Sequence, residues 1–283
     1  MDEASILIIG ANGQLGSALK EKYPQAQSAD IDELDITDPK SVAAYDWSKV
    51  KVILNAAAYT NVDGAELAEG RVTAWQVNAL AVGYLAKAAL EHDLTLVHLS
   101  TEYVFDGTKH PHMEDEPLSP LGVYAQSKAA GDIVVNLVPK HYIVRTSWVI
   151  GQGKNFVRTM LDLGNRGINP AVINDAFGRP TFTPELVRAI DHLLSNHSAY
   201  GTYNVSNEGE VVSWADLTRA VFEVAGLKNT VTNTTDAAYY ADKPETAKRP
   251  HNSDFDLTKI HSTGFTSHNW RDDLKTYIEK ELA

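Results

Sequence analysis

The sequence of 283 residues contains no cysteine. Disulfide bonds, thiolate nucleophiles and zinc sites built on cysteine are therefore excluded. Basic residues are also scarce, since 25 Lys and Arg face 37 Asp and Glu and leave a formal net charge of −12. A chain without a basic surplus or basic blocks is not expected to bind nucleic acid or an acidic membrane surface. A small anionic substrate needs only a few local Arg and Lys residues and stays possible.

Long apolar runs are missing as well. No stretch approaches the roughly 18 apolar residues of a membrane-spanning helix. The acidic N-terminus MDEASILIIG carries too short an apolar run for a signal peptide. The hydrophobic content of 43% and the charged content of 22% are ordinary for a globular protein with a buried core. These features predict a cytoplasmic protein that does not contact membranes.

Short apolar runs alternate with helix-like segments in the first half of the chain. The expected strands are residues 6–10, 25–30, 50–58, 94–100 and 141–149, and the expected helices are 14–23, 71–91 and 122–137. This alternation predicts an α/β fold with a Rossmann-type, doubly wound parallel sheet. Beyond Trp148, glycine and proline break the pattern, with a candidate strand at 201–207 and an amphipathic helix at 214–227. We therefore predict a dinucleotide-binding domain at 1–150 and a smaller, mainly substrate-binding region at 151–283, interleaved with the first.

A glycine-rich turn, GANGQLG at residues 10–16, joins the first strand to the first helix. Gly10 permits a tight turn, Gly13 lets the backbone approach a diphosphate, and Gly16 permits close packing of helix on strand. The helix N-terminus offers free N–H groups to phosphates. The spacing GxxGxxG differs from the usual dinucleotide fingerprint GxGxxG, so an ordinary strand–helix turn is the alternative.

Asp30 follows the turn at the distance where a carboxylate commonly binds the adenosine ribose hydroxyls. The surrounding stretch, SADIDELDITD, has no Lys or Arg to neutralise a 2′-phosphate. This favours NADH over NADPH. The alternative for Asp30 is a solvated acidic loop.

Tyr124 and Lys128 in LGVYAQSKAAG share one face of the expected helix, because residues i and i+4 are neighbours. A lysine ammonium in that position stabilises a phenolate and lowers the tyrosine pKa. Such a phenol can protonate a carbonyl oxygen as hydride reaches the carbon. Tyr–Lys pairs of the same spacing occur at 45/49 and 239/243, and we interpret those as surface or loop.

Polar or small residues follow three of the expected strands, at the sheet edge where open parallel sheets bind ligands. These segments are NAAAYT at 55–60, STE at 100–102 and RTSW at 145–148. Together with Tyr124 and Lys128 on the helix after the fourth strand, a hydroxyl, a phenol and an ammonium can converge on one carbonyl.

These motifs resemble the extended short-chain dehydrogenase/reductase superfamily and, within it, the dTDP-4-dehydrorhamnose reductase family. The resemblance covers nearly the whole chain, and its more specific segments are STEYVFDG, RTSWV, VINDAFGRPT and KRPHNS. It implies NAD(P)H-dependent reduction of the C4 keto group of dTDP-4-dehydro-L-rhamnose to dTDP-L-rhamnose, a step in making cell-surface polysaccharides. STEYVF stands where the family often has STDYVF, so the carboxylate of Glu102 lies one methylene further out.

The resemblance also implies roles for individual residues. Tyr124 would be the proton donor, Lys128 would lower its pKa and hold the nicotinamide ribose, and Thr101 would polarise the C4 carbonyl. Besides Tyr124 and Lys128, the implied or candidate cofactor-binding residues are Gly10, Gly13, Gln14, Leu15, Asp30, Asp35, Ile36, Ala58, Tyr59, Thr60 and Leu99. The substrate sugar would contact Thr101, Glu102 and Trp148, and Arg179 and Arg249 are our candidates for its diphosphate.

Two other functions stay open. A nucleotide-sugar epimerase or dehydratase of the same superfamily regenerates its cofactor in each cycle, and dehydratases usually add an acid–base pair where this sequence has Glu102 alone. A non-catalytic regulatory subunit is the second alternative, and the retention of Thr101, Tyr124 and Lys128 argues against it.

The resemblance leaves the partners and metals less defined. It is compatible with a monomer or a homodimer and with functional association with a dTDP-4-dehydrorhamnose 3,5-epimerase. Some relatives dimerise through Mg²⁺, but the sequence itself supports no metal site. The ten histidines form no ligand-spaced pair, and we interpret His110 and His112, beside acidic residues 114–116, as solvated surface.

Overall fold

The computed structural model describes residues 2–243 and 246–282. Its centre is a sheet of six parallel strands in the order β10-β5-β4-β3-β1-β2. The strands are β1 (Ile6–Ile9), β2 (Gln27–Ala29), β3 (Val52–Asn55), β4 (Thr95–Thr101), β5 (His141–Thr146) and β10 (Gly201–Asn204). The inner strands are almost continuously buried, as expected for a parallel sheet covered on both faces. The predicted Rossmann-type fold is confirmed.

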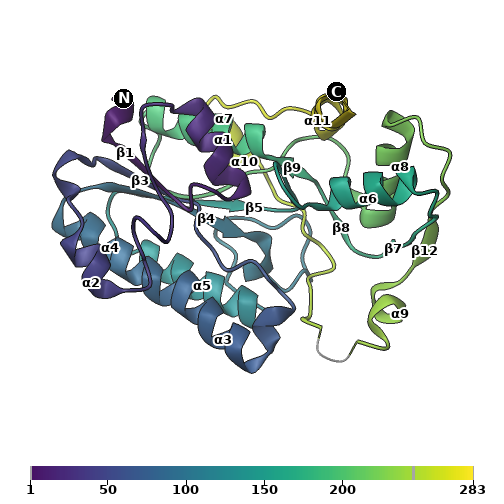
Figure 1. The fold of residues 1–283 in the computed structure, drawn as a ribbon, viewed down its shortest axis with the longest axis horizontal. Helices are drawn as coiled ribbons and strands as arrows, with labels where there is room; N and C mark the ends of the chain where they lie inside the picture. The colour runs from purple at the N-terminus through teal and green to yellow at the C-terminus, as the bar shows by residue number, and fades with distance from the viewer. Residues whose placement is uncertain (1, 244–245, 283) are drawn as a thin grey trace.

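Alternate side chains of each strand point to opposite faces of the sheet. On one face, Ile6 and Ile8 pack beneath α1 (Gln14–Lys22), α7 (Thr183–Ser195) and α10 (Thr258–Ser262). On the other face, Leu7 and Ile9 join a second apolar cluster. The helices of that face are α2 (Pro39–Ala44), α3 (Ala68–Trp75), α4 (Ala81–Glu91) and α5 (Val123–Val135), and a π-helical turn at Gln76–Leu80 joins α3 to α4. Figure 1 shows these two helical layers above and below the sheet.

A second region lies beyond the carboxyl ends of the strands, at the right of Figure 1. Its apolar core is separate from the two clusters of the central sheet. Its helices are α6 (Phe156–Asn165), α8 (Trp214–Val224), α9 (Asp236–Tyr240) and α11 (Trp270–Leu282). Three short strand pairs complete it: β6 (Val149–Ile150) with β9 (Thr181–Phe182), β7 (Ala171–Ile173) with β12 (Thr232–Thr234), and β8 (Phe177–Gly178) with β11 (Val212–Ser213).

The second half of the chain returns to the central sheet. The candidate strand at 201–207 is present as β10, which pairs with β5, and α7 packs against α1. The expected strand 141–149 divides into β5 and β6, because Trp148 has a φ of +46° that interrupts the extended chain. The expected strand 50–58 ends at Asn55. Helix α7 was not predicted, although Pro184 stands in its first turn, a position that suits proline.

Short 3₁₀ turns occur at Glu3–Ser5, Trp47–Lys49, Gly64–Glu66 and Glu102–Val104. Over residues 2–243 and 246–282, no helix is both long and apolar enough to cross a membrane.

Candidate functional site

Three neighbouring cavities follow the carboxyl ends of the strands. The middle cavity, of about 570 Å³, extends from Gly13 to Trp214. It shares Gly13 and Ala58 with a glycine-turn cavity of about 280 Å³. It shares Trp148 and Trp214 with an aromatic cavity of about 380 Å³. Because neighbouring cavities share lining residues, the three form one cleft at the sheet edge where ligands of this fold class bind.

The glycine turn brings the backbone of β1 and α1 very close together. Gly10 has a φ of +73°, and a Cβ there would lie 2.6 Å from the backbone nitrogen of Ala57. A Cβ at Gly16 would lie 2.1 Å from the carbonyl oxygen of Gly10. Helix α1 starts after Gly13 without a side-chain cap, so N–H groups of its first turn are available to a phosphate.

Acidic side chains form the far end of the glycine-turn cavity. Asp30 accepts hydrogen bonds from the backbone N–H groups of Asn12 (3.1 Å) and Ile31 (2.9 Å). The hydroxyl and then the backbone N–H of Thr37 bond Asp35 and lower the pKa of that carboxyl. Among the described residues that line this cavity there is no Lys or Arg. The cavity therefore suits ribose hydroxyls better than a 2′-phosphate.

Most of the predicted cofactor residues are brought together in the cleft. Gly10, Gly13, Asp30, Asp35, Ile36 and Ala58 line the glycine-turn cavity, and Gly13, Gln14, Leu15, Ala58, Thr60, Leu99, Tyr124 and Lys128 line the middle one. Tyr59 differs, because its side chain packs against the small cluster around Ala65. Its backbone N–H and C=O are both bonded to the side chain of Asn78, at 2.9 and 3.1 Å. Asn78 comes from the π-helical turn, and its part in shaping this loop was not apparent from the sequence.

Unpaired polar atoms in the middle cavity fit a polar ligand such as a dinucleotide. Gln14 Oε1, Ser100 Oγ and Thr146 Oγ1 are buried without a hydrogen-bond partner among the described residues. All three residues line this cavity. Since buried polar atoms are nearly always paired in native proteins, these atoms are candidates to bond a ligand. With the glycine turn and the acidic end, the cleft fits an NAD(P)H molecule.

Tyr124 and Lys128 lie one turn apart on α5 and both line the middle cavity. The expected lowering of the tyrosine pKa is not found: burial, followed by the charge of Glu102, raises the pKa of Tyr124. Lys128 Nζ instead donates to the carbonyl oxygen of Leu99 at 2.7 Å and lies 3.2 Å from Nε2 of His98. Burial lowers the pKa of Lys128 to about 8. Tyr124 is therefore held as a protonated phenol.

Thr101 and Glu102 are buried beside Tyr124, at the end of β4. The Thr101 hydroxyl donates to Glu102 Oε2 at 2.7 Å and accepts from the N–H of Tyr103 at 3.2 Å. Burial raises the pKa of Glu102 to about 7. A protonated Glu102 can itself donate to Thr101, and the Thr101 proton is then free for another acceptor in the cavity.

The aromatic cavity is built from segments far apart in the sequence. Trp148 stacks on Trp214 with ring centroids 3.6 Å apart and an interplanar angle of 16°. Its left-handed backbone costs on the order of 1–3 kcal/mol, which is typical of functional sites. The other aromatic residues of the lining are Tyr103, Phe156, Tyr239 and Tyr240. Tyr239 is exposed, as we expected for a surface residue, and it also lines this cavity. The Lys243 ammonium lies 3.8 Å from the centre of its ring.

The two arginines predicted to bind the diphosphate differ in position. Arg249 lines the aromatic cavity, where two hydrogen bonds of 2.8 and 2.9 Å join it to Asp63. Arg179 lines none of the three cavities of the cleft. Its guanidinium pairs with buried Asp254 at 2.9 Å and bonds the carbonyls of Gly209 and Phe255. The structure therefore does not bring Arg179 to the cleft, because its guanidinium is bonded to the buried carboxylate of Asp254 outside the cleft.

The histidine loop differs from the sequence prediction. His112 is completely buried, stacked on Phe105 at 4.6 Å and bonded to Glu116 at 2.9 Å. Only His110 matches the predicted solvated surface, with 54% of its side chain exposed.

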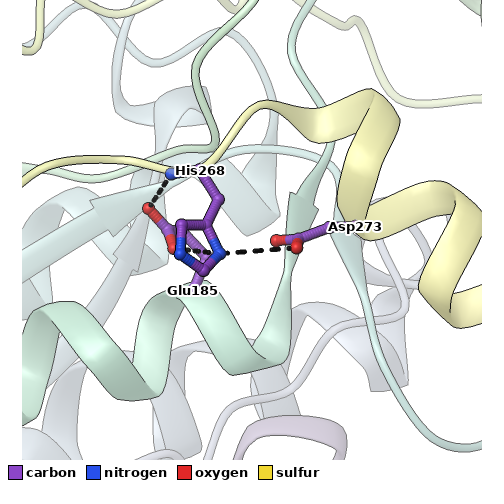
Figure 2. A group of neighbouring side chains, drawn as sticks. All are labelled: Glu185, His268 and Asp273. Atoms are coloured by element: carbon purple, nitrogen blue, oxygen red, sulfur yellow. Dashed lines mark hydrogen bonds and ion pairs between the residues drawn. The ribbon is translucent and has the colours of Figure 1, made fainter.

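One group of acidic and histidine side chains among the described residues is close enough to hold a metal ion: Glu185 of α7, His268, and Asp273 of α11 (Figure 2). The carboxylates already have partners. Glu185 accepts the His268 N–H at 3.0 Å and pairs with Arg188, and Asp273 accepts the Asn207 amide at 2.7 Å. The group lies outside the three cavities. We interpret it as a connection between α7 and α11 and assign no metal to it.

Comparison with known proteins gives a consistent result. The family model described as RmlD substrate binding domain matches residues 4–283. The chain is 40% identical to a dTDP-4-dehydrorhamnose reductase from Aggregatibacter actinomycetemcomitans, over 96% of this chain and 97% of that protein. A dTDP-4-dehydrorhamnose reductase structure from Clostridium acetobutylicum superposes with a TM-score of 0.91 at 34% identity, covering 98% of this chain and 99% of that one.

A second solved structure, of dTDP-4-dehydrorhamnose reductase from Bacillus anthracis in complex with NADP, has a TM-score of 0.88 at 34% identity and covers 97% of both chains. A dTDP-glucose 4,6-dehydratase from Streptomyces venezuelae, at 18% identity, shares the fold alone. The resemblance seen in the sequence motifs is therefore confirmed over nearly the whole length. The chain belongs to the RmlD substrate binding domain family, together with the dTDP-4-dehydrorhamnose reductases to which it is similar.

Proposed function

We propose that this protein reduces the C4 keto group of dTDP-4-dehydro-L-rhamnose to give dTDP-L-rhamnose, with NADPH or NADH as the reductant. The observation that carries the proposal is the position of Thr101, Tyr124 and Lys128. They line a cavity that joins a dinucleotide-binding turn on one side to an aromatic, arginine-containing cavity on the other.

A nicotinamide bound in the middle cavity would supply hydride to sugar C4, and the protein side chains supply the proton and stabilise the developing charge. Tyr124, whose raised pKa keeps the phenol protonated, donates its proton to the C4 oxygen as negative charge develops there. Thr101 donates a hydrogen bond to the same oxygen once its hydroxyl proton no longer bonds Glu102. One preorganised donor of this kind contributes roughly 3 kcal/mol to transition-state stabilisation. Lys128 would orient the ribose of the cofactor.

The remaining cleft residues support substrate binding. The stacked Trp148 and Trp214 offer flat apolar faces to a sugar or base, and Arg249 is a bidentate donor for the diphosphate. To bind it, Arg249 exchanges part of its pairing with Asp63 for a phosphate. We assign cofactor binding to residues 1–150 and most of substrate binding to 151–283. From the second part, β10 completes the central sheet and α7 covers one of its faces.

The rival dehydratase reaction needs an acid–base pair next to the tyrosine. Among the described residues lining the middle cavity, Glu102 is the single carboxylate. This supports a reductase, in which Tyr124 is the acid and no second carboxylate is required.

The direct test is to generate dTDP-4-dehydro-L-rhamnose in situ and to follow the oxidation of NADPH and NADH by their absorbance. We expect one cofactor oxidised per sugar reduced, and the ratio of the two rates gives the cofactor preference. Cofactor binding without net oxidation would contradict the proposal and favour an epimerase or a regulatory subunit. The proposal places the enzyme in the cytoplasm, as a monomer or homodimer, receiving substrate from a 3,5-epimerase. Sedimentation with and without the epimerase tests the last two points.

A further inference from the structure

A row of buried, hydrogen-bonded side chains leads from Asn55 through His98 to Lys128. None of the roles assigned so far includes Asn55 or His98. Asn55 of β3 and His98 of β4 are direct partners in the sheet register, and 2% and 0% of their surfaces are exposed. Asn55 Nδ2 lies 3.0 Å from His98 Nδ1, and His98 Nε2 lies 3.2 Å from Lys128 Nζ. This row of side chains thus connects the end of β3 to the lysine of the middle cavity.

The backbone determines which way the Asn55 amide faces. The N–H of Ala57 donates to Asn55 Oδ1 at 3.2 Å, so the NH₂ group of Asn55 faces His98 and donates to Nδ1. A neutral imidazole has one donor and one acceptor nitrogen. With Nδ1 as the acceptor, the proton of His98 resides on Nε2 and faces Lys128.

This tautomer of His98 suits an uncharged Lys128. An ammonium has donors only, so a charged Lys128 would place two donors face to face across 3.2 Å. A neutral amine accepts from His98 Nε2 and still donates to the Leu99 carbonyl at 2.7 Å. The charged form fits only if the proton of His98 moves to Nδ1. Asn55 must then rotate its amide, which would turn the NH₂ group toward the N–H of Ala57.

We propose that Asn55 and His98 are positioning residues that set the charge of Lys128, with each tautomer of His98 matched to one protonation state of the lysine. The backbone N–H of Ala57 favours the neutral lysine. The consequence for turnover rests on the reductase function proposed above. After Tyr124 has given its proton to the sugar oxygen, a lysine that can be charged or neutral can pass a proton to the phenolate and take its replacement from solvent.

The other groups around Lys128 are consistent with this balance. On its own helix, Tyr124 lies one turn before it and lines the same cavity. The charge of Asp132 acts to raise the pKa of Lys128, while burial lowers it to about 8. Asp132 is itself paired with Arg145 of β5 at 3.0 Å. Burial, followed by the charge of Lys128, lowers the pKa of His98 well below its usual value, so His98 is neutral and has a defined tautomer.

The first test reads the tautomer of His98 in the full-length, cofactor-free protein. Two-bond ¹⁵N–¹H correlation spectra show which ring nitrogen carries the proton, and His98→Gln identifies the signal. We expect the proton on Nε2 in the wild type at a pH above the titration midpoint of Lys128, where the lysine is neutral. In Asn55→Asp, the carboxylate accepts from both Ala57 N–H and His98 Nδ1, so the proton moves to Nδ1. A wild-type proton on Nδ1 at that pH overturns the proposal, and this measurement does not depend on whether Asn55→Asp folds.

The second test titrates Lys128 by the ¹³Cε shift of labelled lysine, with Lys128→Met to identify the signal. We expect the Asn55→Asp substitution to raise the titration midpoint by at least one pH unit. The alkaline limb of kcat should shift by the same amount. Asn61→Asp is the matched control, because it adds a carboxylate to the loop that follows β3 and keeps the acceptor for the Gly64 N–H. It should leave the midpoint unchanged, and equal shifts in both variants overturn the proposal.

The two proposals fail in different ways. Expected tautomers and titrations without turnover of any sugar nucleotide would refute the reductase function and leave the control of Lys128 charge intact. Turnover with an unchanged Lys128 midpoint in Asn55→Asp would support the reductase function and refute the control of Lys128 charge by Asn55 and His98.

Discussion

The two ends of the cleft are built in different ways. At the cofactor end, consecutive β-strand and helix units present backbone N–H groups and small residues, and Gly10 and Gly16 leave no room for a side chain. At the substrate end, aromatic rings converge from α6, α8, α9 and the segment around Trp148. The surface of the cofactor end is formed mainly by backbone atoms of consecutive elements. The surface of the substrate end is formed by side chains that are far apart in the sequence and that tertiary packing brings together.

This difference separates what is shared from what is specific. A backbone cradle suits the phosphates and riboses common to all dinucleotides, whereas a cavity of rings with one guanidinium can distinguish one nucleotide sugar from another, as we propose for this protein. The residues that we propose as catalytic lie where the two ends meet. Substitutions at the junction, at the cofactor end and at the substrate end should therefore affect different measurable quantities.

The largest effect is expected at the junction. Tyr124→Phe removes the proton donor without changing the shape of the cavity, and kcat should fall roughly 10³-fold. The Kd for NAD(P)H, measured by nicotinamide fluorescence, should change less than twofold. Tyr45→Phe, on a tyrosine outside the cleft that bonds Gln27, is the matched control. Full activity in Tyr124→Phe would show that another group supplies the proton.

Glu102, also at the junction, should make stability depend on pH. Its pKa is raised from 4.5 to about 7 in the folded protein, so the native state binds more protons than the unfolded state between these values. Stability then falls as pH rises through this window, by roughly 3 kcal/mol when both states are ionised. In Glu102→Gln, the unfolding free energy should lack this decrease of roughly 3 kcal/mol. Urea unfolding at pH 5, 6, 7 and 8 measures it, and parallel curves for the two proteins would refute the buried, protonated carboxyl.

Gly10→Ala tests the cofactor end. The substitution needs a left-handed backbone and a Cβ 2.6 Å from Ala57, so we expect a loss of about 2 kcal/mol in unfolding free energy and weaker binding of NAD(P)H. Gly153→Ala is the matched control, since its φ is +84° but nothing lies within 4 Å of the added carbon. That control should show the backbone cost of about 1 kcal/mol and no change in cofactor affinity. If both variants bind cofactor normally, the close approach at Gly10 does not shape the cofactor site.

The same contrast explains how much could be predicted from the sequence. The glycine turn, the strand ends and the Tyr124–Lys128 pair are local patterns, in which neighbours in sequence are neighbours in space, and these were predicted correctly as parts of one edge. The pairing of Arg249 with Asp63 and the contact of Asn55 with His98 join positions far apart in the chain, and no periodicity reveals them. The pKa of Tyr124 was misjudged for a related reason: burial and Glu102 outweigh the lysine one turn away.

Trp214→Leu tests the substrate end and should have the smallest effect. It removes the ring stacked on Trp148 at 3.6 Å while retaining an apolar side chain. An aromatic pair contributes about 0.5–1.5 kcal/mol beyond its area, so KM for the sugar nucleotide should rise up to about tenfold. The Kd for NAD(P)H should change little, because Trp214 lies at the far end of the middle cavity and the glycine-turn cavity does not include it. Trp75→Leu, on the exposed face of α3 with 40% of its surface accessible, should change neither constant. A rise in the cofactor Kd in Trp214→Leu would mean that the two ends of the cleft are coupled and that the aromatic stack also positions the nicotinamide.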